Sequence, residues 1–292
     1  MKNLVYLGDN LPLLEALPEG KVDLIYIDPP FNTGKAQSRT RIKTVESADG
    51  DRVGFQGKRY ETIPVRTQAY NDRFGHHLDD YLLAFLAPRL RAAHRVLAAH
   101  GSLYFHIDYR EVHYCKILLD LIFGQENFLN QIIWAYDYGG RSRSRWPAKH
   151  DNILMYVKDI HSYRFAQERM AALEFRAPGR AGAEARQPSD AWWHTIVPTN
   201  SPERTGYPTQ KPIGILKPMI AVSSDPGDLV LDFFAGSGAV GAACRQLDRR
   251  FILADNNPQA WTVWQTRFAG AADITWLQEP GPAALAACCA QM

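Results

Sequence analysis

Short apolar runs alternate with helical patterns along most of this chain, and this alternation constrains the fold more than any other feature of the sequence. Six runs have the length and the continuous apolar character of parallel strands that are buried on both faces of a sheet. They are Leu4–Leu7, Val22–Ile27, Ser102–Ile107, Asn152–Val157, Leu229–Phe233 and Phe251–Ala254. Helical patterns lie at Leu11–Leu17, Leu78–Ala99, Glu111–Phe123, Ile213–Val222 and Ala239–Leu247. Such an alternation predicts an α/β fold with a doubly wound, mainly parallel sheet.

The composition is that of an ordinary globular protein. Of the 292 residues, 46% are hydrophobic and 22% are charged, which excludes collagen-like and largely disordered classes. No apolar run approaches the roughly 18 residues that cross a bilayer, and the first residues lack the apolar stretch of a signal peptide. We therefore expect a cytoplasmic protein that does not bind membranes. The four cysteines, at positions 115, 244, 288 and 289, lack zinc-site spacing, so we expect reduced thiols and no metal.

Basic charge is concentrated in two segments, although the net charge of the whole chain is only +2. Lys35–Arg73 carries nine Lys and Arg against five Asp and Glu, and Gly139–Arg186 carries ten against five. Neither segment has strong helical or strand periodicity, so we expect loops. They are either solvated surface loops or loops that bind a polyanion, and charge alone does not decide between the two interpretations.

A glycine-rich turn follows the fifth predicted strand. The run Leu231–Gly238 passes from an apolar strand through Asp232 into glycines, which allow the backbone to come close to a ligand. Asp255 ends the next predicted strand, and a carboxylate at that place can accept hydrogen bonds from ribose hydroxyls. The sequence therefore predicts a nucleotide-like ligand at this edge of the sheet.

The same turn also contains a dinucleotide-binding pattern. Gly236, Gly238 and Gly241 spell GxGxxG, and Asp255 lies 19 residues after the first of them, as in nicotinamide-dependent oxidoreductases. That fold needs several strands after the glycines, but only about one strand–helix–strand unit follows them here. The strands that complete the sheet precede the glycines, which indicates a circularly permuted nucleotide-binding domain.

An acidic, proline-rich turn follows the predicted strand Val22–Ile27. Pro29 and Pro30 have fixed φ angles, and Pro30 biases Pro29 away from the α region, so the turn is stiff. It holds the Asp28 carboxylate and the Pro29 carbonyl as two acceptors at the carboxyl edge of the sheet, with the ring of Phe31 nearby. Two acceptors and a stacking ring suit a planar base that carries an exocyclic amino group. The alternative is a strand-ending turn in which Phe31 only packs.

The order of these two motifs resembles that of the beta class of S-adenosylmethionine-dependent DNA amino-methyltransferases, in which the catalytic motif precedes the cofactor motif. The resemblance extends over nearly the whole chain. It rests on Leu7–Asn10, Asp28–Phe31, Asn32–Gly34, Gly101–Asp108, Lys149–Leu154, Tyr207–Pro212 and Phe234–Gly238. Tyr207 departs from the usual His, and Asp255 replaces a more usual Glu with the same ribose-binding chemistry. The resemblance implies a Rossmann-like domain, circularly permuted, with a small inserted target-recognition region.

The resemblance also implies a division of the chain. We expect residues 1–159 to form the catalytic part of the methyltransferase domain, with a DNA-contacting loop at 35–77. Residues 160–206 are the candidate target-recognition region, and residues 207–269 form the cofactor-binding part. We expect residues 270–292, which are rich in Ala and Pro, to be a peripheral tail.

The implied reaction is methyl transfer from S-adenosylmethionine to an exocyclic amino nitrogen of a base that is flipped out of duplex DNA, with S-adenosylhomocysteine as the product. Asp28 and the Pro29 carbonyl would accept the two N–H hydrogens and so free the nitrogen lone pair, while Phe31 stacks on the base. The expected cofactor contacts are Asp9 and Asn10 to adenine, Asp255 to ribose, Thr209 and Lys211 to the carboxylate, and Asp232, Phe234, Ala235, Gly236 and Gly238 around the methionine part. A surface lysine at a helix start is an equally good interpretation of Lys211.

The two basic segments would then contact DNA. The expected contacts are Arg39, Arg41, Lys43, Arg141, Arg143, Arg145, Lys149 and His150. Trp146 lies among these basic residues, as aromatic side chains do on nucleic-acid-binding faces. The family further implies double-stranded DNA as partner, a homodimer, a cognate restriction endonuclease in a restriction–modification system, and a bacterial-type location at the nucleoid.

The target base stays open between two candidates. Asp-Pro-Pro-Phe is more typical of N6-adenine enzymes, whereas N4-cytosine enzymes more often carry Ser-Pro-Pro, so we favour adenine. A related RNA or protein-amide methyltransferase would more often carry Asn-Pro-Pro-Tyr with the cofactor motif first, which is the reverse of the order here. A nicotinamide-dependent oxidoreductase and a non-catalytic DNA-binding module are the remaining alternatives.

Overall fold

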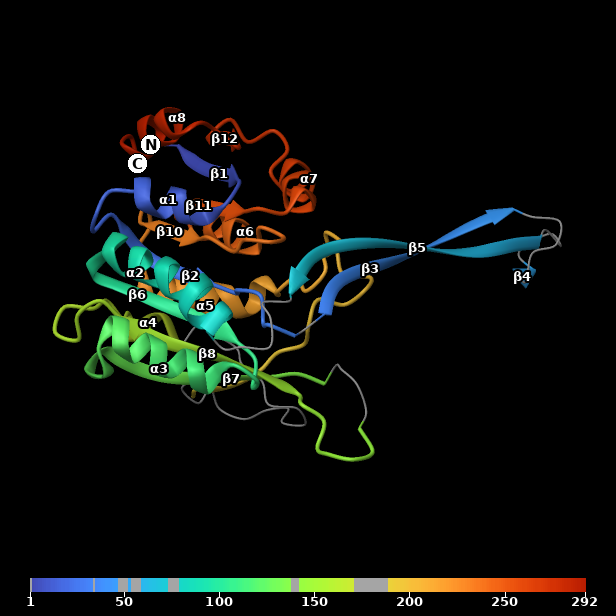
Figure 1. Cartoon of the computed structure of the whole chain (residues 1–292), viewed down its shortest axis with the longest axis horizontal. Helices are drawn as coiled ribbons and strands as arrows, with labels where there is room; N and C mark the ends of the chain where they lie inside the picture. The colour runs from blue at the N-terminus through green and yellow to red at the C-terminus, as the bar shows by residue number, and fades with distance from the viewer. Residues whose placement is uncertain are drawn as a thin grey trace.

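One mixed sheet organises the chain (Figure 1). The computed structural model describes residues 2–33, 35–46, 52–53, 59–72, 79–137, 142–170 and 189–292. Among these residues, nine strands pair in the order β12–β1–β11–β10–β2–β6–β8–β7–β9. Their bounds are β1 Asn3–Leu7, β2 Val22–Ile27, β6 Leu97–Ile107, β7 Phe128–Ala135, β8 His150–Val157, β9 Ala191–Trp193, β10 Leu229–Asp232, β11 Arg250–Asp255 and β12 Ile274–Gln278.

The six strands from β12 to β6 are parallel to their neighbours, which confirms the predicted α/β fold with a mainly parallel sheet. Strand β8 is different, because it is antiparallel to both β6 and β7. The prediction of a parallel strand at Asn152–Val157 was therefore wrong. A continuous apolar run indicates that both faces of a strand are covered, but it carries no information about the strand's direction.

A layer of helices covers each face of the sheet, and the side chains of successive strand residues pack alternately into the two layers. Ile25 and Ile27 of β2 pack into one buried cluster, and Leu24 and Tyr26 pack into the other. The first layer holds α1 Asn10–Ala16, the π-helix η2 Asp79–Leu86, α2 Ala87–Val96, α3 Val112–Phe123 and α8 Pro282–Cys289. The second holds α5 Ile213–Ser223, α6 Ala239–Gln246 and α7 Pro258–Arg267. Short helical turns lie at η3 Gln125–Asn127 and α4 Gln167–Met170.

A long β-hairpin replaces the loop expected at residues 35–77. Strands β3 (Lys35–Glu46) and β5 (Arg59–Asp72) are antiparallel, β4 (Arg52–Val53) pairs with β5, and the arm projects away from the main sheet (Figure 1). The expectation of a segment without strand structure was wrong. Charged residues interrupt the apolar alternation of both strands, and Pro64 sits inside β5 opposite Ile42, where a proline argues against a strand.

Two segments that seemed irregular contribute to the sheet. Residues 270–292, expected as a peripheral tail, supply the edge strand β12 and helix α8, which is buried at Leu285 and Cys289. The candidate recognition region 160–206 supplies β9, which pairs with β7 and buries Trp192. Its residues 171–188 lie outside the described part of the chain.

Within the described ranges, no helix combines the length and the apolar character that a membrane crossing needs. In the same ranges, no group of three or more His, Cys, Asp or Glu residues is arranged to hold a metal ion. The four cysteines are free thiols, of which Cys115, Cys244 and Cys289 are buried and Cys288 is partly buried.

The packing of α8 predicts a clear difference between two leucine truncations. Leu285 in α8 is only 3% exposed, whereas Leu121 in α3 is 80% exposed. We expect Leu285→Ala to lower the free energy of unfolding by about 2–5 kcal/mol, because it leaves a cavity in the first layer. Leu121→Ala should change it by no more than about 0.5 kcal/mol. Urea unfolding followed by circular dichroism measures both, and equal losses would show that α8 does not belong to the core.

Candidate active site

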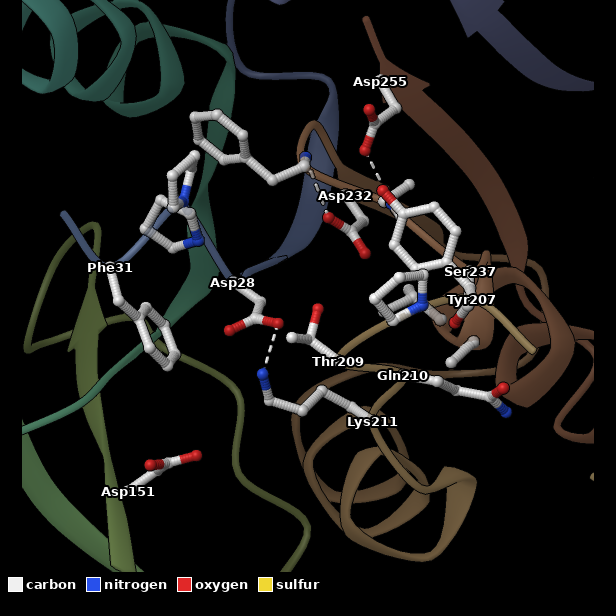
Figure 2. Close-up of a pocket in the computed structure, with 18 of the residues that line it drawn as sticks. Asp28, Phe31, Asp151, Tyr207, Thr209, Gln210, Lys211, Asp232, Ser237 and Asp255 are labelled. Atoms are coloured by element: carbon white, nitrogen blue, oxygen red, sulfur yellow. Dashed lines mark hydrogen bonds and ion pairs between the residues drawn. The ribbon is translucent and has the colours of Figure 1, made fainter. Parts of the chain in front are cut away.

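A cavity of about 1470 Å³ lies at the carboxyl ends of β1, β2, β10 and β11. Both predicted motifs line it, the acidic turn from the N-terminal part of the chain and the glycine turn from the C-terminal part. Figure 2 shows Asp28, Asp232 and Asp255 around this cavity. The structure therefore brings together the two turns that lie about 200 residues apart in the sequence.

The acidic turn is held from outside the cavity. Tyr81 of η2 donates its hydroxyl hydrogen to the Pro30 carbonyl at 2.6 Å, and Asn32, which follows Phe31, has a φ of +51°. The Asp28 carboxylate accepts a hydrogen bond from Lys211 through Oδ2, while its Oδ1 atom is buried and has no hydrogen-bond partner among the described residues. An unmatched buried acceptor costs about 1–3 kcal/mol, so a hydrogen-bond donor that reaches Oδ1 would be stabilised there.

Lys211 contacts two of the predicted catalytic residues, Asp28 and Phe31. Its ammonium lies 2.5 Å from Asp28 Oδ2 and 5.0 Å from the centre of the Phe31 ring, over which it stands. The side chain is only 11% exposed, so the interpretation as a surface lysine was wrong. Figure 2 shows the lysine reaching up from the segment Tyr207–Pro212 toward the carboxylate.

This segment is shaped by hydrogen bonds from Gln210. The Gln210 amide accepts hydrogen bonds from the backbone N–H and the hydroxyl of Thr205 and donates to the Glu203 carbonyl. Thr209 consequently sits with a φ of +58°, a conformation that costs energy for a β-branched residue. Strain of this kind is typical of functional sites, and here it aims Thr209 and Lys211 at the cavity.

The glycine turn and Asp255 form the opposite wall. Gly236 has a φ of +46°, and its N–H donates to Asp255 Oδ2 at 2.8 Å, while the Asn257 N–H donates to Oδ1. Tyr207, in the place of the usual His, lies against Gly236 and accepts a hydrogen bond from the Asn257 side chain. Gly236 has no side chain, and the Asp255 carboxylate is held by backbone N–H groups. The backbone at the end of β10 therefore forms a turn that a ligand can approach closely.

Burial makes two of the carboxyl groups unusually basic. Burial raises the pKa of Asp255 to about 6, although the backbone N–H groups that it accepts oppose the shift. Burial likewise raises the pKa of Asp232 well above its usual value, and the charges of Asp28 and Asp255 add to the effect against the hydrogen bond from the Phe234 N–H. A cavity with so many carboxylates favours ligands that bring donors or positive charge.

A buried hydrogen-bonded chain supports Phe31 from behind, and the sequence analysis missed it. The Tyr26 hydroxyl bonds to His106 Nδ1 at 2.8 Å, His106 Nε2 bonds to Asp151 at 3.2 Å, and Tyr136 donates to the same carboxylate. The His106 and Phe31 rings are stacked, with centres 6.1 Å apart. Burial raises the pKa of Asp151, but the hydrogen bond and charge of His106 outweigh it, so the pKa lies below the usual value.

A second missed group lines the end of the cavity near β1. Arg89 of α2 donates to the side chains of Asn10 and Asp9 at 2.6 and 2.8 Å and lies over the ring of Phe85. Phe85 in turn packs against Phe234. The predicted residues Asp9 and Asn10 therefore do line the cavity, but they share it with Arg89 and with an aromatic wall formed by Phe85 and Phe234. Phe85 and Arg89 lie in the predicted helical pattern Leu78–Ala99, in which the sequence analysis marked no site residue.

The predicted DNA contacts are spread over two places. Arg39, Arg41 and Lys43 belong to β3 of the projecting hairpin, whereas Arg141 lies outside the described residues. Arg143 and Arg145 are exposed in the segment between β7 and β8. Lys149 donates to the Asp137 carbonyl, and His150 begins β8. Asp137 and Ala148 line the cavity, so this second group runs along its rim.

Two glycine substitutions test how tightly the cradle is built. Gly238 (φ +70°) and Gly270 (φ +78°) both have left-handed backbones, but a Cβ at Gly238 would lie 2.8 Å from Cδ1 of Trp264, whereas nothing lies within 4 Å of one at Gly270. We expect Gly270→Ala to lower the free energy of unfolding by about 1–2 kcal/mol through backbone strain. Gly238→Ala should cost clearly more in the same urea titration, and equal costs would contradict the close approach to Trp264.

Similarity to known proteins extends over most of the chain. Residues 22–265 match the family model of N6/N4 methyltransferases, described as DNA methylase. The chain is 30% identical to the type II methyltransferase M.HpaI of Haemophilus parainfluenzae over 84% of this chain and 68% of that protein. It is 29% identical to the DNA adenine methyltransferase YhdJ of Escherichia coli over 86% of this chain and 78% of that protein.

Solved structures agree in fold. The PvuII DNA methyltransferase (cytosine-N4-specific) covers 100% of this chain, and the chain covers 93% of it, with a TM-score of 0.63 at 16% identity. The match of the family model excludes a nicotinamide-dependent oxidoreductase, which the glycine pattern had left open. The prediction from the order of the two motifs is confirmed: the chain belongs to the DNA methylase family, the amino-methyltransferases of the N6/N4 class.

Proposed function

We propose that this protein transfers the methyl group of S-adenosylmethionine to the exocyclic amino nitrogen of a base flipped out of duplex DNA, and that the base is adenine. The observation that carries the proposal is the buried Oδ1 of Asp28, which has no hydrogen-bond partner among the described residues and belongs to a side chain that lines the same cavity as Phe31 and the glycine turn. A base amine supplies the donor that this atom lacks. The amino group is out of reach inside a duplex, so the base has to leave the stack.

The chemistry required of the protein is to make the amine nucleophilic. Its lone pair is delocalised into the base ring, and two acceptors on the N–H hydrogens favour a pyramidal nitrogen with a free lone pair. Asp28 and the Pro29 carbonyl are these acceptors in the proposal. They also stabilise the positive charge that develops on the nitrogen, because they are fixed in a largely buried site before the reaction. Phe31, backed by the ring of His106, holds the base in line.

The opposite wall fits the cofactor. When bound, S-adenosylmethionine supplies an electrophilic methyl group on a sulfonium. The left-handed turn at Gly236 and Gly238 leaves room for it, Phe234 and Ala235 flank it beside Asp232, and Asp255 accepts from the ribose hydroxyls. Asp9 and Asn10, with the aromatic wall of Phe85 and Phe234, receive the adenine. The solved structure of TTHA0409 of Thermus thermophilus complexed with S-adenosylmethionine, which has a similar fold (TM-score 0.59, 19% identity), supports this assignment.

The relatives also support DNA as the substrate. M.HpaI is named a type II methyltransferase and YhdJ a DNA adenine methyltransferase. We assign the phosphate contacts to Arg39, Arg41 and Lys43 of the hairpin, to Arg143, Arg145, Lys149 and His150 at the cavity rim, and to Arg141, with residues 160–206 as the recognition region. We also propose that the protein forms a homodimer and has a cognate restriction endonuclease. Its proposed location is the nucleoid in the cytoplasm of a bacterium.

Adenine is favoured over cytosine by the tetrapeptide at Asp28–Phe31 and by the name of YhdJ, whereas the PvuII enzyme with a similar fold is cytosine-N4-specific. DNA methylated by the purified protein is digested to nucleosides and analysed by mass spectrometry. N6-methyl-2′-deoxyadenosine is the expected product, and N4-methyl-2′-deoxycytidine would reverse the choice of base. Transfer to RNA without transfer to DNA would overturn the proposal. Sequencing of modified bases in the same DNA then reports the recognition sequence.

Removal of the catalytic carboxylate gives the central prediction. Asp28→Ala should abolish methyl transfer to DNA while S-adenosylmethionine still binds, because Asp28 contacts the base and not the cofactor. Transfer of radioactive methyl groups measures the first quantity and calorimetry the second. Asp79→Ala, which removes an exposed carboxylate outside the cavity, is the matched control and should leave both unchanged. Activity that persists in Asp28→Ala would disprove the mechanism.

The raised pKa of Asp255 predicts a pH dependence for cofactor binding. Because that pKa is about 6, the group is ionised above pH 6 and gains a proton as the pH falls through this value. The protonated form offers the ribose hydroxyls a weaker acceptor, so the affinity for S-adenosylhomocysteine should fall by about tenfold one pH unit below the pKa. Calorimetry between pH 7.5 and pH 5 measures it.

Asp255→Asn is the control for this titration. It should bind more weakly at pH 7.5 and lose most of the pH dependence, since the amide does not titrate. The same steep fall with pH in both proteins would assign the effect to another group, such as Asp232.

A further inference from the structure

The ammonium of Lys211 lies over the ring of Phe31, on which the proposed function stacks the base, and it binds the carboxylate to which the proposed function gives the target amine. It donates to Asp28 Oδ2 at 2.5 Å, and it stands over the Phe31 ring at 5.0 Å from the centre. A base that stacks on Phe31 and donates to Asp28 needs the same space. The lysine and the base therefore exclude one another as long as Lys211 keeps this position.

The charges of the cavity explain why the lysine is there without ligands. Asp28, Asp232 and Asp255 line one cavity, and a buried carboxylate without a partner is strongly unfavourable. Asp232 and Asp255 accept backbone N–H groups. Among the other cations of the lining, which are Arg89, Arg110 and Arg204, the first two bind Asp9 and Asp108. Lys211 is the cation that contacts Asp28, and it can leave only if another cationic group or donor replaces it.

We infer that Lys211 is an internal substitute for the target amine, and that cofactor binding displaces it so that the base enters only the cofactor-loaded enzyme. This inference rests on the proposed function. S-adenosylmethionine carries a carboxylate, which attracts the lysine, and a sulfonium, which replaces its positive charge near Asp28. The exchange keeps the charge of the cavity balanced. Thr209, which lines the cavity two residues before Lys211, is placed to hold the same carboxylate.

The exchange couples the two ligands through one side chain. If the cofactor releases Asp28 for the base, then by thermodynamic linkage the base strengthens cofactor binding by the same factor, for which about 5-fold to 150-fold is typical of coupled sites. Removal of the positive charge at Lys211 should reduce this factor toward one in both directions. A lysine that merely positions the carboxylate would not be displaced and would not create the coupling.

The first experiment needs no DNA. Calorimetry gives the affinity for S-adenosylhomocysteine of the wild type, Asp28→Asn, Lys211→Met and the double variant. We expect Asp28→Asn to bind about 5-fold or more tightly than the wild type, because the lysine no longer has to leave a carboxylate. Lys211→Met should bind more weakly, and adding Asp28→Asn to it should have no effect.

Two results would overturn the inference in this experiment. One is an unchanged or weaker affinity in Asp28→Asn. The other is an equal gain in the Lys211→Met background, since the gain would then come from direct repulsion between Asp28 and the ligand. Asp28→Asn is close to isosteric, so the experiment remains decisive if a Lys211 variant folds poorly, a point that thermal unfolding checks.

The second experiment follows the base. A duplex with 2-aminopurine at the target position becomes fluorescent when the base leaves the stack. In the wild type we expect this signal only with S-adenosylmethionine present, which cannot methylate N6 of 2-aminopurine because that base lacks the 6-amino group, whereas Lys211→Met should give the signal without the cofactor. Lys217→Met, which changes a lysine of α5 outside the cavity lining, is the matched control and should behave as the wild type.

The outcomes separate the inference from the proposed function. A Lys211→Met protein that still needs the cofactor for base flipping overturns the role of Lys211. A wild type that gives no signal even with the cofactor overturns the proposed function instead. In that case the cofactor affinities of Asp28→Asn and of the double variant still decide whether Lys211 moves from the Asp28 carboxylate to the carboxylate of the cofactor.

Discussion

The parallel pairing of β2 with β10 is the contact on which the active site depends. Val230 lies opposite Leu24, and Leu231 lies opposite Ile25, so strands from the two ends of the chain become neighbours. Each strand leads into a turn that carries an aspartate, and the turns that follow parallel strands lie at the same edge of the sheet. Asp28 and Asp232 therefore line one cavity. The two halves of the site, to which we assign base binding and cofactor binding, meet because this pair of short strands is aligned.

Burial at that edge then determines how each carboxylate is used. Asp232 and Asp255 are held by backbone N–H groups, which cannot move without unfolding the turn. Asp28 is held by a lysine side chain with several rotatable bonds, and one of its oxygens has no partner among the described residues. The first arrangement suits a binding wall that is the same with and without ligand. The second suits an acceptor whose donor changes during the reaction, which is why Asp28 and not its neighbours is suited to act on the amine.

Local chemistry explains which parts of the structure could be predicted. Strand β2 was predicted with its observed bounds, because an apolar run that stops at Asp-Pro-Pro has few other solutions. The direction of β8 and the support of Phe31 by His106 depend on contacts between distant segments, which no single run of residues encodes. The role of Lys211 was ambiguous for the same reason: its partner, Asp28, is 183 residues away. The order of the motifs located the site in the sequence, but the contacts between its residues could be identified only from the folded structure.

The glycine pattern shows why strand order has to accompany a motif. Gly236, Gly238 and Gly241 are compatible with two cofactors, because both need a backbone cradle at the end of a strand. The difference lies in the neighbours of that strand. Here β10 stands between β11, which ends in the ribose-binding candidate Asp255, and β2, which ends in Asp28. The acidic turn with Asp28 lies on the side of β10 away from Asp255. It leaves room for a second planar ligand whose amine needs a hydrogen-bond acceptor. It is this adjacency, rather than the glycines, that makes the cavity suited to methyl transfer between two bound molecules.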